Sequence, residues 1–475
     1  MSTTTCRHEE GIKAAHESCI DASVRSPLLL LFGNALHWLV VAAFLAFLAS
    51  VKLAFPGFLG GVAFLGYGRL EAMSRDLFLY GWASQAAIAA GIWLMARLSG
   101  RPLGGVILRT VINSAIVLWN LAVLLGTLAI LAGYSTGVEW LEYPNWVSSM
   151  LLLSFLMIGI WVVCLFDRRA NIGSGGRAET ALWYIVAGFC CFPWVYGTAN
   201  LLLTWKPVSG SAQGLVQGWF SGAFLLLWLL PLALASLYAL LPRLSGQHLH
   251  RRNLSPLGFW LFLLLGGWAG LSRLIGGPIP AWMTSAGIVA GVLFLIPVLI
   301  AVINLAFLQR SGGHDGDGIA WQYLRSGLFL VLSSALLGAF VSLPDVSAFA
   351  RFTGVTSARD VLWLLGAVSF TLLGVLHKAT PALLAREVWC AGLSITQYWL
   401  AFAGVLLLAV LLFLEGLVVG LALLDPVVSF LNITSYAQPF HVLEAAAWGI
   451  FLASAVLAAT NFTRALAAER LFPKN

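Results

Sequence analysis

Two cysteines and two histidines near the start of the sequence have the types and spacing of a metal site. Cys6 and His8, followed by His16 and Cys19, supply two thiol and two imidazole donors, the set that holds zinc in a tetrahedral site. The surrounding segment is polar and carries no other folding signal. Chance occurrence in a polar tail is the simpler interpretation, so we predict no metal and keep zinc as the weaker alternative.

Charged residues near the ends of apolar segments form a second candidate group, because a charge in lipid is costly unless it is paired or hydrated. Glu71 and Arg75 lie one helical turn apart and can pair. The group could form a buried polar network, or it could be a set of interfacial charges that face water. Its members are Glu71, Arg75, Asp76, Arg273, Arg359 and Asp360. Two further acids, Glu415 and Glu444, could belong to a proton or ion path or face a partner.

Long apolar runs position these residues. The 475-residue chain is 60% apolar and 9% charged, against about 25% charged residues in soluble domains. Runs of 18 or more apolar residues indicate transmembrane helices. We therefore predict an all-α polytopic membrane protein with a polar tail over 1–26, a twelve-helix domain over 27–462 and a second tail over 463–475. The predicted spans are 27–53, 71–96, 107–133, 144–166, 180–204, 213–241, 256–275, 281–308, 322–343, 360–382, 395–423 and 439–462.

The distribution of cations predicts the orientation. With the N-terminus inside, inside segments hold 19 of the 26 Lys and Arg residues, so both termini are expected in the cytoplasm of a bacterial inner membrane. The net charge of +7 therefore reflects topology and does not indicate nucleic-acid binding. A cleaved signal peptide is not expected, because the start lacks a basic segment followed by a short apolar core.

Several ordered stretches resemble the catalytic subunit (subunit I) of C-family, cbb-type haem-copper oxidases. They include GYGRLEAMS (66–74), GYSTGVEWLEYP (133–144), LVQGWFSGAF (215–224), FWLFLLLGGWAGLSRL (259–274) and RFTGVTSARDVLWLLG (351–366). The resemblance covers nearly the whole chain with loop lengths preserved. It implies a twelve-helix bundle that holds two haems and a copper ion through six histidines.

All six histidine positions carry other residues here. By the resemblance, the ligand of the low-spin haem in the second span falls at Ser74. The copper ligands fall at Gly222, Ser272 and Arg273, the two histidines of the tenth span fall at Arg359 and Val361, and the family's cross-linked tyrosine falls at Gly266. Glycine and valine have no donor, arginine stays protonated, and serine oxygen does not suit haem iron or a copper–imidazole site. We therefore expect neither haem nor copper, and no catalysis by this chain alone.

The favoured functional hypothesis is a degenerate oxidase subunit that acts as a scaffold in a respiratory complex. Its expected partners are membrane lipid, other membrane subunits and periplasmic c-type cytochromes, and a homo-oligomer is a further possibility. A transporter or channel for a small anion or proton through the vacated cavity is one alternative. A haem protein with unusual ligands drawn from His37, His377 or His441 is another, although these histidines are more simply hydrogen-bonded or interfacial.

Overall fold

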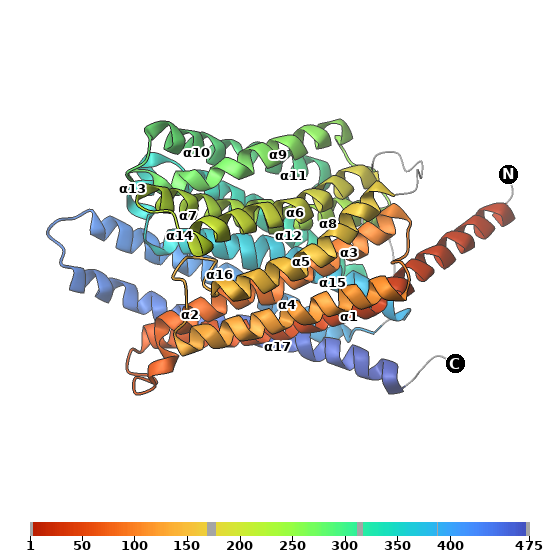
Figure 1. Ribbon diagram of the computed structural model, residues 1–475, viewed down its shortest axis with the longest axis horizontal. Coiled ribbons are helices and arrows are strands. Elements are labelled where there is room, and N and C mark those ends of the chain that lie inside the picture. The colour runs from red at the N-terminus through yellow and green to blue at the C-terminus, as the bar shows by residue number, and fades with distance from the viewer. Residues whose placement is uncertain (1–2, 169–176, 311–316, 387, 472–475) are drawn as a thin grey trace.

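The computed structural model describes residues 3–168, 177–310, 317–386 and 388–471, with side chains described from residue 15 to 467 apart from these gaps and residues 177–178. All regular secondary structure in these residues is helical. Twelve helical segments are long and apolar enough to cross a membrane, which confirms the predicted fold class. Figure 1 shows them as one bundle whose two termini lie at the same end. We call this the terminal end and the opposite one the distal end.

The spanning segments follow one another up and down the bundle (Figure 1). The first six are α1 (Thr3–Ala54), α2–η2–α3 (Tyr67–Asp76, Leu77–Ala83, Ser84–Ser99), α4 (Val106–Ala132), α5 (Asn145–Asp167), α6–η3 (Arg177–Asn200, Leu201–Trp205) and α7–η4–α8 (Ser211–Phe224, Leu225–Leu229, Leu230–Ser245). The last six are η5–α9–η6 (Arg252–Leu254, Ser255–Ala269, Gly270–Leu274), α10–α11 (Ala281–Leu293, Leu295–Leu305), α12 (Asp317–Val341), α14–η7–α15 (Gly354–Val361, Leu362–Val368, Ser369–Leu384), α16 (Ala391–Leu423) and α17 (Phe430–Leu471). Short helices η1 (Ala63–Leu65) and α13 (Pro344–Ala350) lie in connections at the distal end.

The polar start of the chain is helical. Helix α1 runs without interruption from Thr3 through Pro27 to Ala54, so the segment predicted as a tail extends the first span. Arg97 fixes this extension to the second span, since its guanidinium pairs with Asp21 and lies 3.8 Å from Glu17. The Trp93 indole also donates to Asp21, at 3.1 Å.

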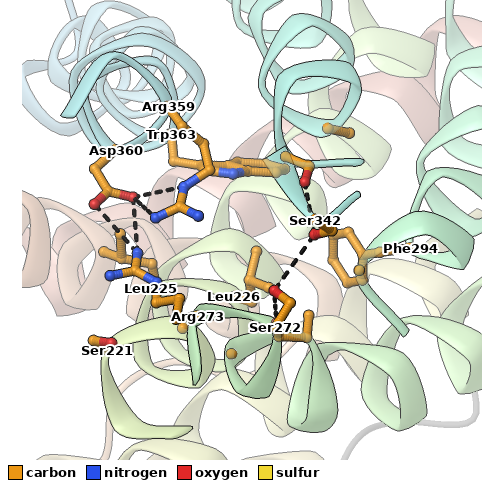
Figure 2. A pocket seen from close by; sticks show the side chains of 16 residues that line it. Ser221, Leu225, Leu226, Ser272, Arg273, Phe294, Ser342, Arg359, Asp360 and Trp363 are labelled. Atoms are coloured by element: carbon orange, nitrogen blue, oxygen red, sulfur yellow. Dashed lines mark hydrogen bonds and ion pairs between the residues drawn. The ribbon is translucent and has the colours of Figure 1, made fainter. Parts of the chain in front are cut away.

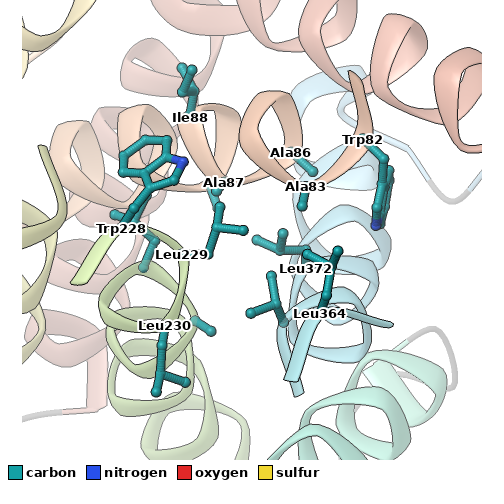
Figure 3. Close-up of a cluster of buried hydrophobic side chains, with 14 of the residues drawn as sticks. Trp82, Ala83, Ala86, Ala87, Ile88, Trp228, Leu229, Leu230, Leu364 and Leu372 are labelled. Carbon is teal, nitrogen blue, oxygen red and sulfur yellow. The ribbon is translucent and has the colours of Figure 1, made fainter. Parts of the chain in front are cut away.

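Three spans form the centre of the bundle. The apolar stretches of α2–η2–α3 and α7–η4–α8 are fully buried, and that of α14–η7–α15 is nearly so. Figure 3 shows their side chains packed together, with Trp82 and Trp228 on either side of small alanines. Both indoles donate hydrogen bonds to serines of other helices, Trp82 to Ser369 at 2.8 Å and Trp228 to Ser84 at 3.1 Å. These spans are also the ones that carry four of the six lost-ligand positions.

Candidate functional site

The six lost-ligand positions surround two small cavities toward the distal end of the bundle. The first cavity has a volume of about 50 Å³ and is lined by residues of α7, η4, η6, α12 and α14 (Figure 2). The second has a volume of about 120 Å³ and lies between α2, the 133–144 connection, α14, η7 and α17. Sites for drug-sized ligands usually occupy about 300–1,000 Å³. Neither cavity reaches the size that a porphyrin needs.

Helices α7 and η6 are in direct backbone contact where the copper ligands are expected. A Cβ atom built on Gly222 would lie 2.2 Å from the Cα atom of Gly270. In the reverse direction, a Cβ atom on Gly270 would lie 2.8 Å from the carbonyl oxygens of Gly218 and Trp219. A side chain of any size at residue 222 would force these helices apart. The contact therefore excludes an imidazole at Gly222 in this arrangement.

Ser272 and Gly266, which lie near Gly222, also make close contacts with other parts of the protein. The Ser272 hydroxyl donates to the carbonyl oxygen of Ala269 at 2.8 Å and accepts from the Ser342 hydroxyl at 3.4 Å. At the position of the lost tyrosine, a Cβ atom on Gly266 would lie 3.1 Å from Leu227 and 3.4 Å from Phe294. Aliphatic and aromatic packing has taken the space on this side of the site.

Arg273 and Arg359 share one carboxylate. Nη2 of Arg273 donates to both oxygens of Asp360, at 3.0 and 3.2 Å, and Nε and Nη2 of Arg359 donate to Oδ1 of Asp360 at 3.0 and 2.9 Å. Figure 2 shows the two guanidinium groups converging on Asp360 at the edge of the cavity. Arg273 and Arg359 thus form a largely buried ion cluster with Asp360.

The cluster continues through the 133–144 connection. Glu139 lies 3.5 Å from Nη1 of Arg273 and 3.9 Å from Nη1 of Arg75, and Arg75 Nη2 lies 2.9 Å from Oε1 of Glu142. The result is a charge chain that ties α2, the connection, η6 and α14 together. We define this charge chain as Glu142, Arg75, Glu139, Arg273, Asp360 and Arg359.

The charge chain contains four of the six residues proposed as a polar network from the sequence, and the proposed residues Glu71 and Asp76 are not part of it. Arg75 pairs with the connection instead of with Glu71, because the connection folds over the end of α2. Sequence reasoning missed Glu139 and Glu142, although two acids in a short connection beside apolar spans were a usable signal. Since Asp360 and Glu139 compensate Arg273 and Arg359, an anion would meet little net positive charge there.

Asp76 is the most unusual member of this region. It is fully buried, and no N–H or hydroxyl group of a described residue donates to its carboxylate oxygens. Its side chain lies within hydrogen-bond reach of the carboxyl group of Glu142, a residue of the connection outside the spans. Burial raises the pKa of the Glu142 carboxyl above its usual value, and Arg75 opposes that rise. The distal end therefore holds two carboxyl groups in mutual contact below one guanidinium.

The side of the site where the resemblance places the low-spin haem holds the second cavity, whose lining residues offer no imidazole. The Ser74 hydroxyl donates to the carbonyl oxygen of Glu71 at 2.9 Å, within its own helix. Val361 lines the second cavity with aliphatic carbon. The buried Trp363 indole lies beside the first cavity, with its ring centre 6.3 Å from that of Phe294 (Figure 2). The bulky side chains of Leu362 and Trp363, which follow Val361 in the sequence, therefore lie inside the bundle.

The backbone near these positions has an irregular geometry that the sequence did not predict. The segments η2, η4 and η7 are π-helical, and they begin within three residues of Ser74, Gly222 and Val361. Single π-helical turns occur frequently at functional sites, where they direct side chains that a regular helix would turn elsewhere. Three such segments meet at the centre of this bundle.

The donors at these positions do not fit haem or copper. Serine oxygen, two carboxylate-bound guanidinium groups, glycine and valine supply no imidazole or thiolate. Elsewhere among the described residues, no three His, Cys, Asp or Glu side chains gather as a metal site would require. The zinc alternative is untested, since the side chains of Cys6 and His8 lie outside the described ones. His16 Nε2 lies 3.2 Å from the Gly100 carbonyl oxygen, and Cys19 is an exposed free thiol.

The three remaining span histidines lie apart from this site. His37 is exposed on the side of α1, and His441 is partly buried near the distal end of α17. His377 is buried in α15, where Nδ1 contacts the Leu373 carbonyl oxygen at 2.9 Å and the ring packs against Tyr323 and Trp389. Because one ring faces outward and another lies deep in a different helix, the geometry gives a haem shared by these histidines no support.

The two isolated acids have different environments. Glu415 Oε2 accepts a hydrogen bond from the backbone N–H of Gly354 at 3.1 Å, so α16 caps the start of α14. Glu444 is buried in α17, and its Oε1 has no hydrogen-bond partner among the described residues. A structural role accounts for Glu415. Neither acid contacts the charge chain.

Comparison with known proteins agrees with the fold. The family model described as "Cytochrome C and Quinol oxidase polypeptide I" matches residues 26–460. The chain belongs to this family. It is similar to the "Cbb3-type cytochrome c oxidase subunit CcoN1" of Stutzerimonas stutzeri, at 23% identity over 91% of this chain and 93% of the relative. It is also similar to a "Cytochrome c oxidase subunit 1 homolog" of Agrobacterium tumefaciens (strain T37), at 22% identity over 90% of this chain and 80% of the relative.

Family membership has two consequences for this protein. It is a multi-pass membrane protein of the oxidase subunit I type, and the resemblance read from the ordered motifs is confirmed. The low identity fits a divergent member.

Proposed function

We propose that this protein is a membrane scaffold derived from an oxidase subunit I, with neither haem nor copper at the inherited positions. The observation that carries the proposal is the backbone contact between Gly222 and Gly270, which occupies the place of a copper ligand. The charge chain supports it, because Arg273 and Arg359 are bound to carboxylates across four segments. We infer that the close helix contact and the ion pairs in this region stabilise the fold.

The expected partners are c-type cytochromes and other membrane subunits of an electron-transfer complex. Two observations support this part of the proposal. A relative is named as a subunit of a cbb3-type cytochrome c oxidase, which is a protein of several chains. In addition, the hairpin of α16 and α17 extends past the other helices at the distal end (Figure 1).

The tip of this hairpin is strongly apolar. Helix α17 has 42 residues and is about 63 Å long, which exceeds a bilayer of about 40–45 Å with its headgroups. Large apolar side chains exposed at the tip include Leu421, Leu424, Val427, Phe430 and Leu431. No Lys or Arg occurs between Arg386 and Arg464. Exposed apolar patches of this kind usually mark protein or membrane contacts.

Two measurements test the proposal. The optical spectrum and metal content of the purified protein should show no stoichiometric Soret band and no stoichiometric copper. Gentle solubilisation of membranes from the native host, followed by purification through a tag on this chain, should recover a cytochrome or another membrane subunit. A Soret band at one haem per chain contradicts the loss of cofactors, and a chain that purifies alone in every detergent contradicts the scaffold.

A further inference from the structure

A groove at the terminal end of the bundle is independent of the cofactor region. It has a volume of about 230 Å³, larger than either distal cavity. Its walls are the first turns of α6 and the η5–α9 junction, two segments about seventy residues apart in the sequence. The lining residues are Glu179, Thr180, Trp183, Arg252, Asn253, Ser255, Pro256 and Phe259.

The groove is polar at its rim and aromatic one helical turn deeper. Glu179, Arg252 and Asn253 are exposed at the rim. Below them, the Trp183 ring packs edge-on against Phe259 at 5.4 Å and against Trp260 at 6.0 Å between ring centres. Trp260 is itself exposed on the side of the bundle. Tryptophan is enriched at the level of lipid headgroups, so this arrangement places the groove at a membrane surface.

Two opposite charges face the groove without pairing. Glu179 and Arg252 both line it, yet neither forms an ion pair with the other or with any other described residue. Arg252 begins η5, which runs directly into α9; the Ser255 N–H donates to the Arg252 carbonyl oxygen and Pro256 has no N–H, so the group offered to an anion here is the Arg252 guanidinium. A guanidinium attracts phosphate. A carboxylate on the opposite wall attracts an ammonium group.

We propose that this groove binds the headgroup of an aminophospholipid of the phosphatidylethanolamine class. The phosphate contacts Arg252, the primary ammonium group contacts Glu179, and the acyl chains lie on Trp183, Phe259 and Trp260. Glu179 disfavours headgroups whose charge is purely negative. A choline headgroup fits less well, because its quaternary nitrogen has no N–H to donate to the carboxylate.

The test measures lipid binding to the whole purified chain after removal of its native lipid. Intact-protein mass spectrometry compares phosphatidylethanolamine, phosphatidylcholine and phosphatidylglycerol with the same acyl chains. One phosphatidylethanolamine should bind about two- to fivefold more tightly than phosphatidylcholine, the range expected for one exposed charge contact. Glu179→Gln should abolish this preference, and Arg252→Gln should weaken binding of all three lipids.

Controls keep the test decisive. Arg251→Gln removes a neighbouring charge that does not line the groove, and it should leave binding unchanged. If Arg252→Gln does not fold, Arg252→Lys keeps the charge and should give intermediate affinity. Equal affinity for the three lipids, or a preference that survives Glu179→Gln, overturns the proposal. Competition by soluble glycerophosphoethanolamine at the lipid's own concentration overturns the assignment to a lipid.

Discussion

Gly222 and Gly270 bring two helices so close that a Cβ atom on Gly222 would lie 2.2 Å from the Cα atom of Gly270. Glycine is required there by the approach of the two backbones, and no side chain can turn away from a Cα atom at this distance. The contact lies where the resemblance places a copper ligand. A histidine at residue 222 and this backbone contact are therefore mutually exclusive.

The first prediction is that Gly222→Ala lowers the thermal stability of the purified protein. Overpacking a close contact costs about 1–3 kcal/mol, although alanine is the better helix former. The matched control is Gly214→Ala in the same helix, where no atom lies within 4 Å of the added Cβ. Melting curves in one detergent compare the variants. Equal melting temperatures for the two variants would show that the helices are free to separate at residue 222.

The second prediction concerns the shared carboxylate. Asp360→Asn leaves two mostly buried guanidinium groups without their common partner, and breaking such a buried pair costs about 3–5 kcal/mol. Asp345→Asn, at an exposed position of the distal end, is the control. Denaturation midpoints measure both. If the two variants were equally stable, the charge chain would contribute nothing to the fold.

A double variant refines this result. Arg359→Gln combined with Asp360→Asn removes one charge of each sign, so part of the lost stability should return. Non-additivity of this kind is the expected sign of residues in one network.

The third prediction is a pH dependence that arises at Glu142. Because burial raises the pKa of its carboxyl in the folded protein, the folded state holds this proton at pH values where the unfolded state has released it. The contribution of Glu142 to the free energy of unfolding therefore declines as the pH rises above 4.5, the ordinary pKa of a glutamate carboxyl, and it is smallest at high pH. The charged and acidic neighbours are Arg75, Asp76 and Glu139.

Glu142→Gln removes this titration. The stability of the variant relative to the original protein should therefore increase from pH 5 to pH 8, as melting temperatures in matched buffers would show. Glu139→Gln, which changes a partly exposed carboxylate of the same connection, is the control. A relative stability of Glu142→Gln that falls with rising pH would reverse the sign and refute the argument.

The sequence was sufficient for the fold, because apolar runs define spans whose length the bilayer sets. The assignment of the six ligand positions rests on the resemblance and stays a prediction. The sequence was not sufficient to predict which carboxylates form ion pairs with Arg75. Spacing along the helix pointed to Glu71, whereas the folded connection presents Glu142 and Glu139. The π-helical segments and the Gly222–Gly270 contact depend on packing between distant spans, which no local pattern encodes.

The last prediction distinguishes two reasons why haem would not bind, namely the side-chain volume in the site and the absence of imidazole ligands. Trp363→Ala removes a buried indole beside the first cavity and should cost about 3–5 kcal/mol, the usual range for large-to-small changes in a core. Trp399→Ala, at an exposed position of α16, should cost much less. When haem is added to Trp363→Ala, no Soret band of a ligated haem should appear, because the new space brings no imidazole with it. If such a band did appear, side-chain volume would be the feature that keeps haem out, and the loss of the histidines would be secondary.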